Sequence, residues 1–185
     1  MTNSIAIFCG SALGSDQIFS ETARQVGHAI AEQGKTLVYG GGRSGLMGIV
    51  ADSALEAGGQ VIGVIPHVLV DRELAHQGLT ELHVVKDMQE RKLKMSALSD
   101  GFIAMPGGAG TLEEIFEQWT WAQLGIHLKP NAFLNVNGFY DDLIKFLKMT
   151  TSKGFTHARF TDSLIVSDSV KAILKQMDQF QAPEP

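Results

Sequence analysis

The chain has 185 residues, of which 44% are hydrophobic and 19% are charged, and its formal net charge is -5. This composition indicates a globular protein with a full core and excludes a disordered or fibrous chain, and the negative charge argues against nucleic-acid binding through phosphates. The single cysteine excludes an internal disulfide. No apolar run approaches the roughly 18 residues of a membrane span and no signal sequence is recognisable, so we expect a cytoplasmic protein that does not contact a membrane.

Short apolar runs alternate with segments of helical period along the whole chain. We predict strands at 4–9, 36–40, 60–65, 81–85, 101–105, 131–136 and, in a less regular run, 163–167. We predict helices at about 16–33, 44–57, 88–99, 111–124, 139–153 and 168–180. Because parallel strands need crossover connections, this alternation predicts the α/β class, with a doubly wound parallel sheet and helices on both faces. We expect one domain over residues 1–185, ending in a flexible tail at 181–185.

The turn CGSALGSD (9–16) follows the first predicted strand. Ligands of an open parallel sheet bind outside the carboxyl ends of its strands, so each such turn is a candidate binding segment. Gly10 allows close approach of a ligand to the backbone, and Ser11 offers a hydroxyl, which together suit a ribose or a phosphate. The alternative is an ordinary turn in which Ser15 or Asp16 caps the next helix.

The turn YGGGRSGLMG follows the second predicted strand. Gly40, Gly42 and Gly45 satisfy the G-x-G-x-x-G spacing of dinucleotide-binding turns. Such a site also needs an acidic residue at the end of the following strand, which here ends in VIPHV (64–68) and has none. The spacing therefore favours a tight turn whose amides, such as those of Gly41 and Gly42, face a smaller ligand.

The helix predicted at 88–99 carries two adjacent cations on its apolar side. Asp87 and Glu90 have the spacing of a capping box, which places the start of the helix at this point. At 100° per residue, Arg91 and Lys92 fall beside or within the apolar stripe. Buried cations require an anionic partner, so the pair predicts a bound anion. The alternative is that both side chains reach solvent or a structural carboxylate.

The segment PGGAGTLEE (106–114) forms a sharp turn and the start of a helix. Free amides and the positive end of that helix converge at 108–111, which predicts an anion site. Thr111 and Glu114 also have the spacing of a capping box, in which Glu114 would serve only the helix backbone. Glu113 has no such structural role.

These motifs carry a specific resemblance. In this order, YGGGRSGLMG, DMQERK and PGGAGTLEE, followed by WAQLGIHLKPNAFLNVNGFYDDL, resemble the LONELY GUY family of cytokinin riboside 5'-monophosphate phosphoribohydrolases over about residues 5–155. The resemblance implies a Rossmann-like homodimer that hydrolyses the N-glycosidic bond of an adenosine-type 5'-monophosphate. The products would be the free base and ribose 5-phosphate, and the reaction needs no cofactor and no metal.

The resemblance also assigns residues. It implies that Arg91 is catalytic and that the catalytic glutamate is either Glu113 or Glu114. Together, the turns and the resemblance give an expected substrate-binding set of Ser11, Gly41, Gly42, Glu73, Lys92, Gly107, Gly108, Ala109, Gly110 and Thr111. Ala109 stands where many family members have a tyrosine, which leaves the preference among nucleotide substrates open.

The chemistry of the reaction fits these residues independently of the resemblance. N-glycoside cleavage places positive charge on the ribose and negative charge on the departing base, so it calls for a carboxylate and a cation. Three alternatives remain open at this point. They are a nucleotide-binding module without turnover, an AMP nucleosidase with little preference for modified bases, and a pyridoxal-phosphate decarboxylase using Lys92.

Overall fold

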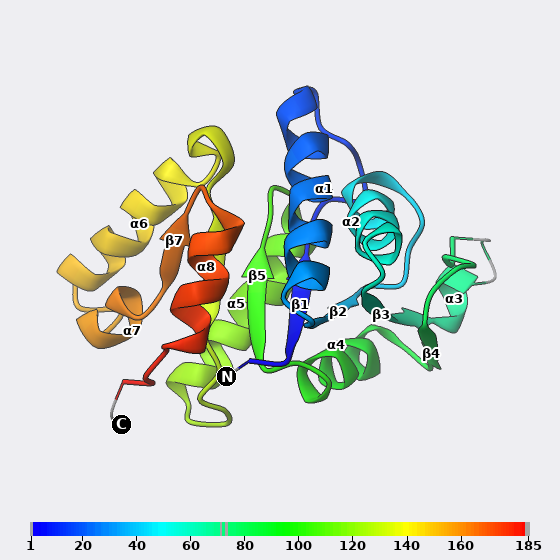
Figure 1. Cartoon of the computed structure of the whole chain (residues 1–185). Helices are drawn as coiled ribbons and strands as arrows, with labels where there is room; N and C mark the ends of the chain where they lie inside the picture. The colour runs from blue at the N-terminus through cyan, green and yellow to red at the C-terminus, as the bar shows by residue number, and fades with distance from the viewer. Residues whose placement is uncertain (1, 71, 73, 184–185) are drawn as a thin grey trace.

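Seven strands form one sheet in which every pairing is parallel (Figure 1). The computed structural model describes residues 2–70, 72 and 74–183. The strands are β1 (Ser4–Phe8), β2 (Thr36–Tyr39), β3 (Gln60–Pro66), β4 (Glu81–Val85), β5 (Gly101–Ala104), β6 (Asn131–Leu134) and β7 (Ile165–Ser167). Their order across the sheet is β4-β3-β2-β1-β5-β6-β7. All the strands expected from the sequence are confirmed, including the one within 163–167.

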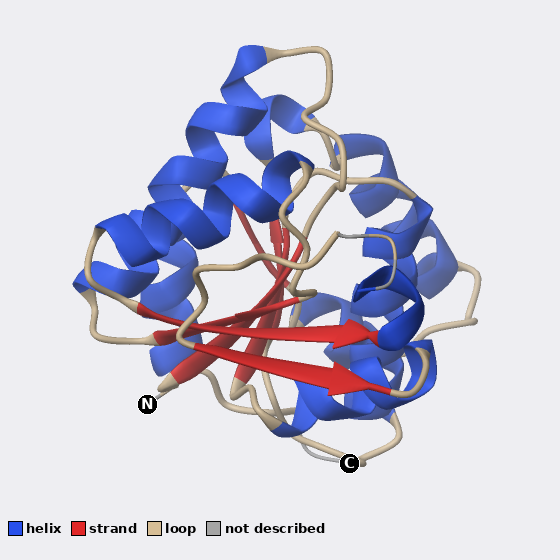
Figure 2. Ribbon diagram, turned by 90° about the vertical axis from the view of Figure 1, so that its right-hand side faces the viewer, coloured by secondary structure: helices blue, strands red, loops and turns tan. Residues whose placement is uncertain are grey.

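Helices cover both faces of this sheet, as the alternating pattern predicts (Figure 2). One face packs against α1 (Gln17–Glu32), α2 (Gly45–Glu56) and α8 (Val170–Asp178). The other packs against α4 (Met88–Ala97), α5 (Ala109–Gln123), α6 (Asp141–Ser152) and α7 (Ala158–Asp162). Two further short elements are α3 (His67–Val70) and the 3-10 turn η1 (Val136–Gly138). Within the described chain, no helix is both long and apolar enough to cross a membrane.

The side chains of each central strand divide between two hydrophobic clusters. Ile5 and Ile7 of β1 pack on the side of α1 and α2, whereas Ala6 and Phe8 pack on the side of α4 and α5. All four residues are at most 3% exposed. Because successive strand residues point to opposite faces, a strand buried on both sides must be apolar throughout. This explains the uninterrupted apolar runs in the sequence.

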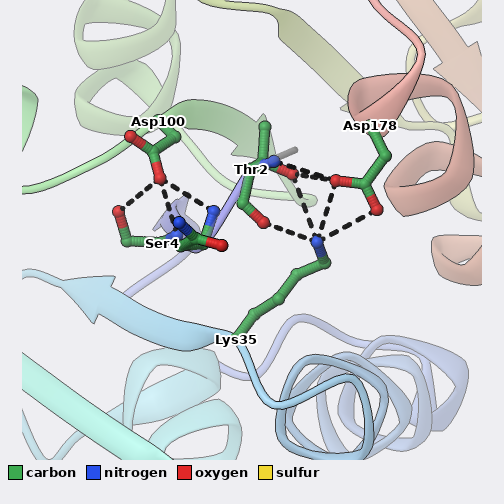
Figure 3. Close-up of polar contacts among 6 residues, drawn as sticks. Thr2, Ser4, Lys35, Asp100 and Asp178 are labelled. Carbon is green, nitrogen blue, oxygen red and sulfur yellow. Dashed lines mark hydrogen bonds and ion pairs between the residues drawn. The ribbon is translucent and has the colours of Figure 1, made fainter.

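Polar contacts close the amino-terminal edge of the sheet (Figure 3). Lys35, just before β2, donates hydrogen bonds to the carbonyl of Thr2 and to the carboxylate of Asp178 at the end of α8. Burial alone would raise the pKa of Asp178, but hydrogen bonds from Thr2 and Lys35 outweigh it and lower that pKa to about 2. Asp100 accepts the backbone N–H of Ser4 at 3.0 Å. These contacts lie at the edge opposite the carboxyl ends of the strands.

The point where the strand order reverses lies between β1 and β5. From β1 the chain moves outward through β2 and β3 to β4, and it then returns to pair β5 with β1 on the other side. The turns that follow these two strands touch, since the amide of Gly10 donates to the carbonyl of Pro106 at 3.1 Å. Such a reversal opens a crevice at the carboxyl edge, where ligands of doubly wound sheets bind.

Candidate active site

A cavity of about 620 Å³ opens at this reversal point. Most of the predicted site residues line it, namely Ser11, Gly42, Arg91, Gly108, Ala109, Gly110, Thr111, Glu113 and Glu114. Gly41, Gly107 and Lys92 are absent from the lining formed by the described residues. Glu73, the expected substrate-binding acid, lies outside the described residues. The turns after β1, β2 and β5 therefore meet at one site, as their positions at strand ends predict.

The glycines of the turn after β2 allow neighbouring segments to pack closely against it. Gly45 has a φ of +62°, and a β-carbon there would overlap the backbone of Ser11. A β-carbon on Gly40 would overlap the guanidinium of Arg91. Gly41 has a φ of +71° and packs on Ile65, which accounts for its place behind the cavity wall. The turn is tight, as predicted, and its glycines admit Ser11 and Arg91 to the site.

Gly107 also has a structural reason to be a glycine. A β-carbon at this position would overlap the side chain of Thr111 and would approach the amide of Gly10 to 2.9 Å. The residue thus lets the turn after β5 fold over the start of α5 and against the turn after β1. This role brings the two turns together, and the expected contact of Gly107 with a substrate stays a prediction.

Arg91 is a buried cation held by backbone carbonyls. Its residue exposure is 7%. Its Nε donates to the carbonyl of Val64 and its Nη2 to the carbonyl of Gly40, both at 3.1 Å. Among the described residues, no carboxylate lies within ion-pair distance of this guanidinium. The carbonyls fix its plane without neutralising it, so Arg91 offers a full positive charge to the cavity that it lines.

Lys92 has a different environment from its neighbour. Its Nζ binds Glu113 Oε1 at 2.5 Å and Glu117 Oε1 at 2.9 Å, and its side chain is 7% exposed. Burial alone would lower the pKa of Lys92, but the hydrogen bonds to the two glutamates outweigh it and raise that pKa. The alternative interpretation, a structural carboxylate partner, therefore holds for Lys92 among the residues described.

The capping-box interpretation of Thr111 and Glu114 is wrong. α5 begins at Ala109 with Gly108 as its N-cap, so Thr111 is already the third helical residue. No side-chain hydrogen bond caps this helix. The helix begins two residues earlier than predicted. Ala109 and Gly110 belong to it, whereas the sequence PGGAG predicted a turn at both positions. The side chain of Glu114 therefore does not cap the backbone of α5.

Glu114 lines the cavity, and Arg91, Lys92, Glu113 and Glu117 are the charged groups near it. Burial raises its pKa to about 7, with Arg91 opposing the increase and Glu113 adding to it. Among the described residues it forms no ion pair, whereas the side chain of Glu113 is 55% exposed and bound to Lys92. An acid with a pKa near neutrality in a cavity is suited to exchange protons or to stabilise a developing cation.

The start of α5 leaves its first amides free. The amides of the residues from Gly108 to Thr111 have no side-chain cap, whereas Asp16 caps α1 and Asp87 caps α4 as the sequence predicts. Ser44, the N-cap of α2, also makes no side-chain capping bond and lines the same cavity. Free amides together with the positive end of a helix favour a bound anion at this side of the cavity.

Part of the cavity wall is apolar. It is formed by Met47, Ile65, Leu69, Leu74 and Met88, which come from α2, β3, α3, the segment after α3 and α4. The carbonyl of Leu74 accepts the amide of Arg43 at 3.0 Å, which ties this segment to the turn after β2. Sequence reasoning missed Leu69 and Leu74, because an apolar residue outside a motif does not distinguish a cavity wall from the core. Their position after a strand end was the available signal.

Cys9, the residue directly after β1, lines the cavity. It is buried, and burial raises the pKa of its thiol well above the usual range. A thiol that stays protonated is a poor nucleophile, so Cys9 contributes packing surface.

The chain is similar in sequence to known proteins over most of its length. A family described as "Possible lysine decarboxylase" matches residues 47–177. The chain is 41% identical to cytokinin riboside 5'-monophosphate phosphoribohydrolase LOG7 of Arabidopsis thaliana, over 96% of this chain and 82% of the relative. It is 44% identical to the cytokinin riboside 5'-monophosphate phosphoribohydrolase of Rhodococcoides fascians, over 92% of this chain and 87% of the relative.

Solved structures share the fold. The Moco carrier protein from Chlamydomonas reinhardtii superposes with a TM-score of 0.74, covering 97% of this chain and 98% of that one, at 21% identity. At this identity the match shows the Rossmann-like arrangement alone.

Proposed function

Because the chain belongs to the LONELY GUY (LOG) family of cytokinin riboside 5'-monophosphate phosphoribohydrolases, we propose that it hydrolyses the N-glycosidic bond of an adenosine-type 5'-monophosphate. The products are the free base, of the N6-modified cytokinin type, and ribose 5-phosphate. One observation carries the assignment of the site. Arg91 and Glu114 line the same cavity without a charged partner among the described residues, and the uncapped start of α5 lines it as well.

The 5'-phosphate is bound at the start of α5. The amides of the residues from Gly108 to Thr111 donate to its oxygens, and the positive helix end compensates its charge. Gly108 and Gly110 leave open space at their α-carbons, so a phosphate can approach the backbone closely. Binding energy at this remote group fixes the ribose against the catalytic residues.

Glu114 acts on the ribose. It lies one helical turn after the amides proposed to bind the phosphate. This spacing supports a contact between its carboxylate and the sugar of the nucleotide. When ionised, it stabilises the positive charge that develops on the ribose and orients the attacking water. Its pKa of about 7 leaves about half of it ionised at neutral pH.

Arg91 acts on the departing base. Its guanidinium is held at the ends of β2 and β3, next to the apolar wall that includes Ile65 and Met88. This wall suits the flat face of a purine and an apolar N6 substituent. Donors preorganised in a water-poor cavity stabilise the negative charge that develops on the purine as the bond breaks.

The direct test is incubation of the purified protein with AMP and with isopentenyladenosine monophosphate. Release of free base together with ribose 5-phosphate is the expected result, and no release from either nucleotide by the folded protein contradicts the proposal. Saturable calorimetric binding without products would instead establish a nucleotide-binding module.

The decarboxylase alternative is disfavoured by the position of Lys92. A Schiff base requires an accessible, unprotonated amine. Lys92 lies outside the cavity lining and is bound by two carboxylates that raise its pKa. An absorbance band of pyridoxal phosphate in protein purified with that cofactor would reverse this assignment.

We also propose a cytoplasmic homodimer on the basis of the family resemblance. The loop after α5 exposes Leu124, Ile126 and Leu128, each more than 60% accessible, and such a cluster is typical of a subunit interface. Light scattering with size-exclusion chromatography tests the dimer, and a monomer at micromolar concentration contradicts it. Cell fractionation tests the location.

A further inference from the structure

Two adjacent pairs of charged residues face each other across α4 and α5. α4 carries Arg91 and Lys92, and α5 carries Glu113 and Glu114. Neighbouring residues of a helix point about 100° apart, so their side chains face different surroundings. Arg91 and Glu114 present unpaired charges to the cavity, whereas Lys92 and Glu113 bind each other.

Lys92 joins the two helices through two carboxylates. Its ammonium binds Glu113 at 2.5 Å and Glu117 at 2.9 Å. These glutamates are four residues apart, so they occupy the same face of α5. One turn further along α4, Ser96 Oγ donates to Gln118 Oε1, next to Glu117 on α5, at 2.8 Å and continues the contact. The start of α5 is therefore fixed to the start of α4 beside the cavity.

The charges of this contact surround Glu114. Among the described residues, the charged or titratable groups that act on it are Arg91 and Lys92 from α4, Glu113 and Glu117 from α5, and the thiol of Cys9. Glu117 Oε2 is buried and has no hydrogen-bond partner within the described chain. Loss of the Lys92 charge would leave two carboxylates beside Glu114 without a cation of their own.

We propose that Lys92 is a positioning residue that, with Glu113 and Glu117, braces α4 against α5 and holds Arg91 and Glu114 at a fixed separation across the reacting bond. Lys92 does not touch the substrate. This inference rests on the proposed function, because it assigns Arg91 and Glu114 to the two sides of that bond. It reassigns Lys92 from substrate binding, the role that the family resemblance implied.

The first test compares Lys92→Met with Lys94→Met. Lys94 lies on the same helix and forms no ion pair among the described residues, so its variant is the matched control. In Lys92→Met, kcat for base release should fall by about tenfold or more, because small displacements of catalytic groups are costly, while KM changes less than kcat. Lys94→Met should retain the kcat of the unmodified protein.

The pH dependence separates positioning from a merely structural role. Lys92 lowers the pKa of Glu114, and Glu113 raises it. If the ionised Glu114 is active, the ascending limb of the profile of kcat against pH moves to higher pH in Lys92→Met. In Glu113→Gln the same limb moves to lower pH. Lys92→Arg, which can bind both carboxylates, should restore most of the activity and the original limb.

Two outcomes overturn the inference. One is a raised KM in Lys92→Met, with unchanged kcat and an unmoved pH limb, because this pattern is that of a substrate ligand. The other is an absence of coupling between Lys92→Met and Glu117→Gln in thermal unfolding, which would mean that the brace does not exist. The unfolding measurement does not depend on catalytic activity, so it also applies if Lys92→Met is too unstable for kinetics. The double variant removes both charges of the ion pair, so it leaves neither charge buried without its partner.

These results are distinct from a failure of the proposed function. If the unmodified protein releases no base from either nucleotide, the reaction assignment is wrong, and the catalytic part of this inference falls with it. If the unmodified protein is active but Lys92→Met raises KM and leaves kcat and the pH limb unchanged, only the proposed role of Lys92 in positioning is wrong.

Discussion

Glu113 and Glu114 differ sharply although they are adjacent in the sequence. Glu113 is paired with Lys92 and is more than half exposed, whereas Glu114 has a pKa raised to about 7 by burial in the cavity. Sequence reasoning found the pair and left the choice between its members open, and the capping box that would have given Glu114 a backbone role is absent from the structure. The capping box depends on where the helix begins, and α5 begins at Ala109, two residues before the predicted start.

Glu114→Gln should lower kcat for base release by about a hundredfold or more, because the carboxylate that stabilises the ribose cation is lost. Glu113→Gln should lower kcat by a smaller factor, because Lys92 keeps Glu117 as a partner. Steady-state kinetics with isopentenyladenosine monophosphate makes the comparison. The reverse order of the two losses would assign catalysis to Glu113.

The pH profile of kcat/KM should rise through an apparent pKa near 7. The sign follows from the role of the group, because Glu114 must be ionised to stabilise the ribose cation, so activity is lost as pH falls below its raised pKa. Initial rates between about pH 5 and pH 9 measure the limb. A limb that stays flat down to about pH 5 would exclude Glu114 as the ionising group.

At the scale of elements, periodicity predicted the strands and the longer helices well. β1 and β5 are apolar on both faces, so their runs are unmistakable in sequence. The short helices α3 and α7 were missed because four or five residues complete barely one turn and show no helical period. α3 matters most, since its Leu69 lines the cavity.

The turn after β2 provides a test of element packing. Gly45→Ala should lower the free energy of unfolding by more than about 1 kcal/mol, because φ is +62° and the new methyl group would overlap the backbone of Ser11. Gly110→Ala is the matched control, since it lies in a helix with nothing within 4 Å of the added carbon. Urea denaturation compares the two variants. Equal stability would mean that the two turns do not pack as described.

At the scale of the whole molecule, the alternation of elements predicted a parallel sheet but could not give the order of its strands. The order depends on the return from β4 to β5, which places the turns after β1 and β5 side by side. That pairing decides which of the candidate turns share a cavity. Three of them do, and α4 adds Arg91 from the side.

The architecture also separates stability from activity. The contacts of Lys35 with Thr2 and Asp178 close the amino-terminal edge, while the uncapped helix start and the unpaired charges gather at the carboxyl edge. Side chains at the first edge can therefore bond fully with one another. Among the described residues, the second edge has helix amides without a side-chain cap and charges without an ion-pair partner.

The most direct test of the proposed reaction is to follow both products from isopentenyladenosine monophosphate in water enriched in heavy oxygen. The unmodified protein should release free base and ribose 5-phosphate in equal amounts, with the heavy oxygen of water bonded to C1 of the sugar, in the hydroxyl that replaces the base. Glu114→Gln should release both products far more slowly. Absence of base release by the unmodified, folded protein would contradict the assignment.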